Sequence, residues 1–261
     1  MRVLDKIADA ARLRVAREKS RVPAQALESL PGWQRVPLDF AAAFRGEGPC
    51  IIAEVKLRSP SCADLGQGLD PVEVALAYAR NGAAALSVLT EPEFFGGSMQ
   101  VLCAVRQRVS LPLLMKDFVV DPYQLGQARA CGADAVLLIA ALWPQGLADM
   151  LGRTASLGLA ALVEVHDEAE LELALSAGAR IIGVNNRDLR TIAVDLEVSR
   201  RLAAEAAGRA DLLIAESGLS RRAELDGLRR LGYRGFLIGS AFVAGKKPGA
   251  ALAAMLGRPP A

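Results

Sequence analysis

The sequence is poor in the residues that build metal centres and disulfide frameworks. It has one histidine, His166, and four cysteines with no CxxC spacing among them, Cys50, Cys62, Cys103 and Cys131. A lone histidine and these scattered cysteines do not make a zinc ligand set of any usual spacing. We therefore expect no metal site, and interpret the cysteines as reduced, mostly packed thiols.

Long apolar runs and a strong charge of one sign are also missing. No run approaches the roughly 20 apolar residues of a membrane span, and residues 1–20 alternate apolar and charged side chains at helical spacing, unlike a signal peptide. The formal net charge is +2 with the basic residues scattered, which is not the footprint of a nucleic-acid-binding protein. We expect a cytoplasmic protein with no membrane or nucleic-acid partner, acting on a small molecule.

Apolar residues are plentiful, and they fall in short runs separated by helix-like segments. They make up 52% of the 261 residues, which is ample for a large core. Each run has the length of a buried strand. The runs are CIIAEV (50–55), AALSVLT (84–90), LPLLMK (111–116), DAVLLIA (134–140), LAALVEV (159–165), ARIIGVN (179–185), DLLIAES (211–217) and GFLIGS (235–240).

The segments between the runs carry signals for helix ends and helix starts. A glycine one to three residues before a run suits the left-handed turn that closes a helix. Such glycines are Gly82, Gly132, Gly158, Gly178 and Gly232. Helix starts are indicated by Asp70-Pro71, by Asp121-Pro122, and by Asp167 with Glu170 in a capping-box arrangement.

Eight repeated strand-helix units predict a closed (β/α)8 TIM barrel. Nearly continuous apolar strands are those covered on both faces, as parallel strands are. The alternative is an open doubly wound sheet, which usually has fewer strands and a glycine fingerprint after the first one. We expect residues 1–261 to form one barrel domain, with residues 1–45 as an N-terminal helical extension packed on it.

Charged and polar residues interrupt these runs at their carboxyl ends, where a barrel has its active site. Any one of them taken alone would suit a structural role, but convergence from five strands favours a pocket. They are Glu54, Lys56, Lys116, Glu164, Asn185, Arg187, Glu216 and Ser217.

The loops after the last two runs, ESGLSRR and IGSAFVAG, predict a phosphate site. Each has a small hydroxyl residue and Gly or Ala leading into a helix start, so backbone N–H groups are open to an anion. Among weaker signals, His166 is interpreted as a loop residue rather than a base. Phe94, Phe95 and Phe118 suit either the core or a platform for an aromatic substrate.

Across nearly its whole length the chain resembles the indole-3-glycerol-phosphate synthase family of tryptophan biosynthesis. The segments that carry the resemblance are IAEVKLRSPS, LSVLTEPEFFGGS, LLMKDFVVDPYQ, GADAVLLI, LVEVHDEAEL, IIGVNNRDLRT, AESGLS and FLIGSAF. Two segments depart from the family pattern: SPSCADLG stands where SPSKG is common, and IGSAF where IGE is common.

The resemblance implies a carboxy-lyase that needs no cofactor. It closes the ring of 1-(2-carboxyphenylamino)-1-deoxyribulose 5-phosphate to give indole-3-glycerol phosphate, carbon dioxide and water. It implies that Lys116 is the acid of ring closure and that Glu164 is the base of dehydration. It also implies that Lys56, oriented by Glu54, binds the carboxylate and can serve as a second acid. Asn185 and Glu216 would complete the polar network.

The resemblance also implies the residues that hold the substrate. Ser59 and Arg187 would hold its carboxylate, and Phe95, Phe118, Leu137 and Leu189 would enclose its ring. Ser217, Gly218, Gly239 and Ser240 would bind its phosphate. A monomer or weak homo-oligomer is expected. Two alternatives stay open: a catalytically silent paralogue that binds another pathway enzyme, and an isomerase of phosphoribosyl compounds.

Overall fold

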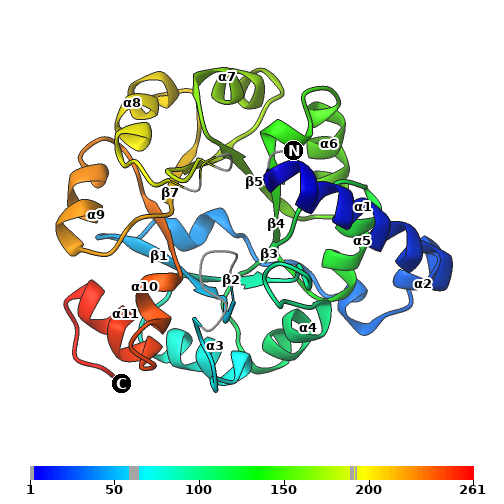
Figure 1. Ribbon diagram of the computed structural model, residues 1–261, viewed down its shortest axis with the longest axis horizontal. Helices are drawn as coiled ribbons and strands as arrows, with labels where there is room; N and C mark the ends of the chain where they lie inside the picture. Colours follow the sequence, from blue (N-terminus) through cyan, green and yellow to red (C-terminus); the bar gives the residue numbers. More distant parts are fainter. Residues whose placement is uncertain (1–2, 59–64, 189–190, 192) are drawn as a thin grey trace.

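The computed structural model describes residues 3–58, 65–188, 191 and 193–261, and its strands form a closed parallel barrel in chain order. Every neighbouring pair is parallel, including β1 with β8, so the (β/α)8 prediction is confirmed and the open sheet is excluded (Figure 1). The strands are β1 Cys50–Val55, β2 Ala85–Leu89, β3 Leu113–Lys116, β4 Ala135–Ile139, β5 Ala160–Val165, β6 Ile181–Asn185, β7 Leu212–Glu216 and β8 Gly235–Ile238.

Helices surround the barrel, and the glycine turns lie where the sequence predicts them. All five junction glycines have positive φ, for example +94° at Gly82 and +102° at Gly232. The helices after β1 are α3 Pro71–Arg80, α4 Met99–Arg108, α5 Tyr123–Ala130, η3 Ala140–Leu142, α6 Leu147–Ser156, α7 Glu168–Ser176, α8 Glu197–Ala206, α9 Arg222–Arg229, α10 Ser240–Val243 and α11 Pro248–Leu256.

Two of the three predicted helix starts differ in detail. Asp70 caps α3 as expected, accepting from the N–H groups of Val72 and Glu73. The capping box predicted at Asp167 forms only by half: Asp167 accepts from the N–H of Glu170, but the Glu170 carboxylate accepts from the N–H of His166, one residue before the cap. The Glu170 carboxylate thereby also contacts the His166 ring.

At the start of α5 the helix begins one residue later than the proline suggests. Pro122 precedes the first helical residue, Tyr123, instead of occupying it. The Asp121 carboxylate accepts from the N–H of Tyr123 and also from the Lys19 ammonium of the N-terminal helix. Asp121 thus lies one position before the N-cap and links the start of α5 to the N-terminal helix.

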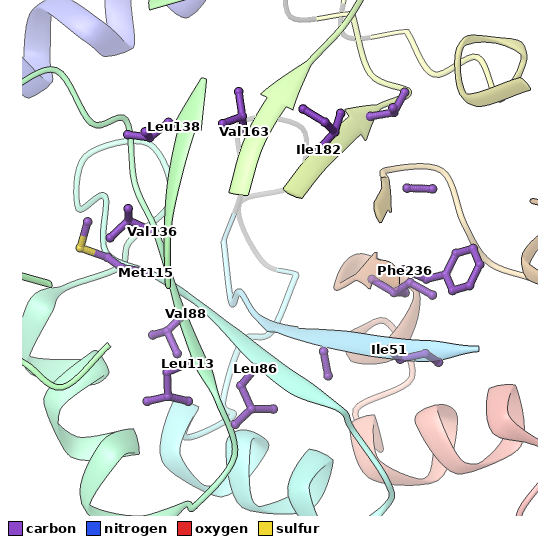
Figure 2. Packing of buried hydrophobic residues seen from close by; sticks show 14 of the residues in the cluster. Ile51, Leu86, Val88, Leu113, Met115, Val136, Leu138, Val163, Ile182 and Phe236 are labelled. Carbon is purple, nitrogen blue, oxygen red and sulfur yellow. The ribbon is translucent and has the colours of Figure 1, made fainter. Parts of the chain in front are cut away.

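The strands divide their side chains between two apolar clusters. On β1, Ile51, Ala53 and Val55 face the helices and belong to the outer cluster, whereas Cys50 and Ile52 face the barrel axis and belong to the inner one. Figure 2 shows the outer cluster along the strands, with Phe236 of β8 among its largest members. Because successive side chains on a strand alternate in direction, Glu54 must follow Ile52 into the interior.

The N-terminal extension contacts both ends of the barrel, where the sequence predicted only that it packs on the barrel. It consists of α1 Val3–Arg21, α2 Ala24–Leu27, η1 Pro31–Gln34 and η2 Ala41–Phe44. Near the carboxyl end, Arg14 of α1 pairs with Asp117, directly after β3, and Figure 1 shows α1 in dark blue beside α5. At the amino end, Phe44 lies against Gly235, the first residue of β8.

None of the helices in the described part of the chain has the combined length and apolarity that a membrane crossing requires.

Candidate active site

A cavity of about 460 Å³ opens at the carboxyl ends of the strands. It brings together residues that the sequence singles out on strands far apart in the chain. Those that line it are Glu54, Lys56, Phe95, Lys116, Phe118, Leu137, Glu164, Asn185, Arg187, Glu216, Ser217, Gly218, Gly239 and Ser240. The other two predicted substrate-binding residues, Ser59 and Leu189, lie outside the described residues.

The charges at the base of the cavity come from the four odd-numbered strands. Each occupies an inward position at the carboxyl end, and the inward residue two positions earlier is apolar, because side chains alternate along a strand. The charged set is Glu54, Lys116, Glu164 and Glu216. The apolar set below it is Ile52, Leu114, Leu162 and Ile214. Alternate strands of a barrel fill one layer of its interior, which explains how four distant residues meet.

Gly183 on β6 makes room for one of these carboxylates. A Cβ atom at this position would lie 2.3 Å from Oε1 of Glu216 and 3.1 Å from a methyl group of Leu162. The sequence run ARIIGVN gives no hint of this, because the neighbour lies on the next strand.

Lys116 is the cation at the centre of the charged set. Its Nζ lies 2.5 Å from Oε2 of Glu216 and 3.5 Å from Oε2 of Glu164. Burial favours loss of the proton, but Glu216, Glu164 and Glu54 together outweigh burial and raise the pKa of Lys116 well above its ordinary value. Lys116 is therefore protonated throughout the physiological pH range.

The pKa of Glu216 is also raised, but here burial is the main cause. Its burial, together with the charge of Glu164, raises the pKa of the Glu216 carboxyl despite the Lys116 ammonium. Its Oε1 is buried and has no hydrogen-bond partner among the described residues.

Glu164 is held from three sides. Its Oε1 accepts from Nδ2 of Asn185 at 3.1 Å and lies 3.2 Å from Nε2 of His166, while Oε2 faces Lys116. Burial raises the pKa of Glu164, but Lys116 and His166 outweigh burial and hold it below the ordinary value. Glu164 is therefore an ionised carboxylate, able to accept a proton.

Glu54 and Lys56 form a close ion pair on the cavity wall. Their Oε1 and Nζ atoms are 2.6 Å apart, and Glu54 is buried. Burial raises the pKa of Glu54, yet Lys56 and Lys116 together lower it below the ordinary value. The backbone of Gly239 packs directly on this carboxylate, where a Cβ atom would lie 2.6 Å from Oε1.

Two phenylalanines form one apolar wall, and two buried carboxylates that the sequence analysis missed hold them. The Phe95 and Phe118 rings are 6.0 Å apart between centroids. The Glu91 carboxylate accepts from the N–H groups of residues 93–95, and Asp117 accepts from the N–H of Phe118. Phe94 packs against the inner apolar cluster, as Phe95 does, but is not among the described residues that line the cavity. The available signal was an acidic residue one position before Phe118 and another four positions before Phe95.

The two predicted phosphate loops face the cavity side by side. Ser217 and Gly218 both have positive φ, +65° and +78°, directly after β7. The helices that follow differ from the expectation: α10 has only four residues, and α9 begins at Arg222, beyond the loop. An anion here would depend on loop N–H and hydroxyl groups more than on a helix terminus.

His166, interpreted from the sequence as a loop residue, is a direct neighbour of Glu164. Its position two residues after Glu164 and four before Glu170 was the signal that could have revealed this.

Among the described residues, no group of three or more His, Cys, Asp or Glu side chains is arranged to hold a metal ion. The cysteines in the same part of the chain, Cys50, Cys103 and Cys131, are free.

Comparisons with known proteins identify a family and relatives of this chain. Residues 4–255 match the family model described as indole-3-glycerol phosphate synthase. The chain is 44% identical over 261 residues to the indole-3-glycerol phosphate synthase of Carboxydothermus hydrogenoformans, covering 97% of this chain and 99% of that protein. It is 46% identical to the one from a Roseiflexus species, covering 92% and 93%. These matches favour a synthase over the two alternatives that the sequence analysis left open.

Proposed function

The chain belongs to the indole-3-glycerol phosphate synthase family, and from this we propose that Lys116 is the acid and Glu164 the base of the family's reaction. That reaction is a decarboxylating ring closure of a phosphorylated aromatic substrate. The observation that carries the assignment is the position of Lys116 between Glu164 and Glu216 at the cavity base.

Ring closure requires an acid, because the ring carbon that bears the carboxylate attacks the ketone and leaves negative charge on its oxygen. Lys116 donates a proton to that oxygen as the charge develops. The raised pKa keeps Lys116 fully in the ammonium form at neutral pH, so the proton that this step needs is present. Loss of carbon dioxide then restores the aromatic ring.

Dehydration requires a base, because a proton must leave the carbon next to the new ring bond while the former ketone oxygen departs as water. Glu164 is ionised and faces the cavity, and Asn185 fixes its orientation. The former ketone oxygen takes up two protons before it leaves as water. One of them makes up for the negative charge of the carboxylate, which departs as neutral carbon dioxide. The other matches the proton that Glu164 removes from carbon.

The remaining residues hold the substrate in place. Lys56, oriented by Glu54, binds the substrate carboxylate with help from Arg187 and Ser59. Phe95, Phe118, Leu137 and Leu189 enclose the aromatic ring. Ser217, Gly218, Gly239 and Ser240 bind the phosphate. The members of this set that the structure describes all line the same cavity, which supports the arrangement.

The test follows indole fluorescence after the carboxyphenylamino substrate is added to purified protein. Wild type should produce indole-3-glycerol phosphate, and Glu164→Gln should lose at least about a hundredfold in turnover, as expected for removal of a general base. Near-normal turnover in Glu164→Gln would reject the assignment of the base without rejecting the family reaction.

The organisation of the chain is part of the proposal. We expect one domain, present as a monomer or weak homo-oligomer. Light scattering during gel filtration measures the mass directly, and a stable higher oligomer would contradict this expectation.

A further inference from the structure

His166 lies between two carboxylates at the back of the proposed base. Its Nε2 is 3.2 Å from Oε1 of Glu164, and its Nδ1 is 2.9 Å from Oε2 of Glu170. The His166 ring lies at the end of β5. Glu170 of α7 also accepts a hydrogen bond from the backbone N–H of His166, which brings its carboxylate next to the ring. The half-formed capping box is thus what places Glu170 against the ring.

The geometry determines the protonation state of this ring. An ionised carboxylate can only accept hydrogen bonds, so a ring nitrogen that faces one carries a proton. Both nitrogens of His166 face carboxylates, which favours the imidazolium ion. Burial opposes the charge, but Glu164 and Glu170 outweigh it and raise the pKa of His166 to about 10.

A second cavity of about 420 Å³ lies behind the ring. His166 and Glu170 line it, whereas Glu164 lines the substrate cavity, and Asn185 lines both. His166 therefore contacts the proposed base from the side opposite the substrate. Among the described residues, the other titratable groups on this second cavity are Asp167, Asp188, Asp195 and Arg201.

We propose that His166 is a positioning residue for Glu164: held between Glu164 and Glu170, it fixes Oε1 and leaves Oε2 to the substrate. The inference rests on the proposed role of Glu164 as base. Within the part of the chain that the structure describes, Nε2 has no aligned hydrogen-bond partner, so its contact with Glu164 is an ion pair rather than a linear hydrogen bond. Contacts of this kind commonly tighten when substrate binds.

Two substitutions separate the two sides of the ring. The amide of Gln reaches the position of Nε2 and can still donate to Glu164, whereas the amide of Asn reaches only the position of Nδ1 and Glu170. His166→Asn should lower kcat about tenfold with KM nearly unchanged, because the base is present but poorly held. His166→Gln should lose clearly less.

The pH profile distinguishes positioning from a purely structural role. Without the imidazolium charge the pKa of Glu164 rises, so the acid limb of kcat should move to higher pH in both variants, whose side chains are neutral. Arg201→Gln, which alters the far wall of the same cavity, is the matched control and should leave that limb in place.

Glu164→Gln provides the comparison that separates the two proposals. If Glu164→Gln loses turnover and His166→Asn adds little in that background, the inference is supported. If Glu164→Gln is nearly normal, the proposed base is wrong. If Glu164→Gln loses turnover but His166→Asn keeps normal kcat and an unmoved acid limb, or its loss adds fully to that of Glu164→Gln, His166 does not position Glu164 and the inference is overturned.

Discussion

Lys116 shows how one residue gains its chemistry from neighbours remote in sequence. Glu216 lies 100 residues away along the chain and yet contacts Nζ at 2.5 Å. Three carboxylates keep the ammonium charged in a buried place, where an isolated lysine would lose its proton. The same contacts mean that removal of Lys116 affects both catalysis and stability.

Lys116→Met should lower single-turnover rate at least about a hundredfold, the usual contribution of a general acid. The similar shape of methionine suggests a retained fold, but the structure predicts a lower melting temperature as well, because buried carboxylates lose their partner. Adding Glu216→Gln to this variant should restore part of the melting temperature but not the rate. A single-turnover rate within a few-fold of wild type would reject Lys116 as the acid.

Glu54 and Lys56 can be tested as a pair. If they form only a structural ion pair, replacing both by Gln and Met removes two desolvated charges together and activity survives. Our proposal predicts instead a folded variant with a similar or higher melting temperature and greatly reduced turnover. Restoring Lys56 alone should recover part of the rate. A stable and fully active double variant would show that the pair has no part in the reaction.

At the scale of elements, the loops after β7 and β8 are the parts that approach the phosphate. Gly218 is a poor place to test them: a Cβ atom there would lie 2.3 Å from a Val194 methyl group, and its φ of +78° disfavours larger residues. Ser240 is exposed on the cavity rim, so its substitution should leave the fold intact.

Ser240→Glu should raise KM about tenfold or more and change kcat little, because a phosphate far from the reacting atoms is bound equally in ground and transition states. Ser240→Gln has the same length without the charge and should stay near wild type. A substrate analogue without its phosphate should not distinguish the two variants. Equal KM values for Glu and Gln would remove Ser240 from the phosphate site.

At the scale of the whole molecule, the N-terminal extension is tied to the barrel by Asp134 at its amino end. This fully buried carboxylate is paired with Arg35 of the extension and with Arg106 of α4. It also accepts from the N–H groups of Leu38 and Leu113. Asp134 therefore links the N-terminal extension to α4 and to the start of β3.

Asp134→Asn should destabilise the protein by about 3 kcal/mol, as expected when one partner of a buried ionic network is removed. Thermal unfolding followed by circular dichroism should show a lower midpoint but still one transition, if the extension and the barrel unfold together as one domain. Two separated transitions would contradict that organisation. Asp149→Asn, at an exposed pair with Arg153, is the matched control and should change little.

His166 also makes stability depend on pH. Its pKa of about 10 in the folded protein exceeds the ordinary 6.5, so the folded state keeps a proton that the unfolded chain releases. The stabilisation is fully present below about pH 6.5 and is lost as the pH rises towards 10. The melting-temperature advantage of wild type over His166→Gln should therefore shrink across this range. A constant difference would mean that His166 is not protonated.

The sequence by itself determined the features that arise from neighbours along the chain. Strand runs, glycine turns and the charges at strand ends follow from local backbone preferences and from alternation along a strand, so the barrel and its charged rim could be predicted. Only the tertiary structure decided that Gly183 makes room for Glu216, that the extension reaches both barrel ends, and that His166 joins Glu164 to Glu170. The physical reason is range: ion pairs and steric contacts act over a few ångströms in space, and the closed sheet brings together residues that the sequence keeps far apart.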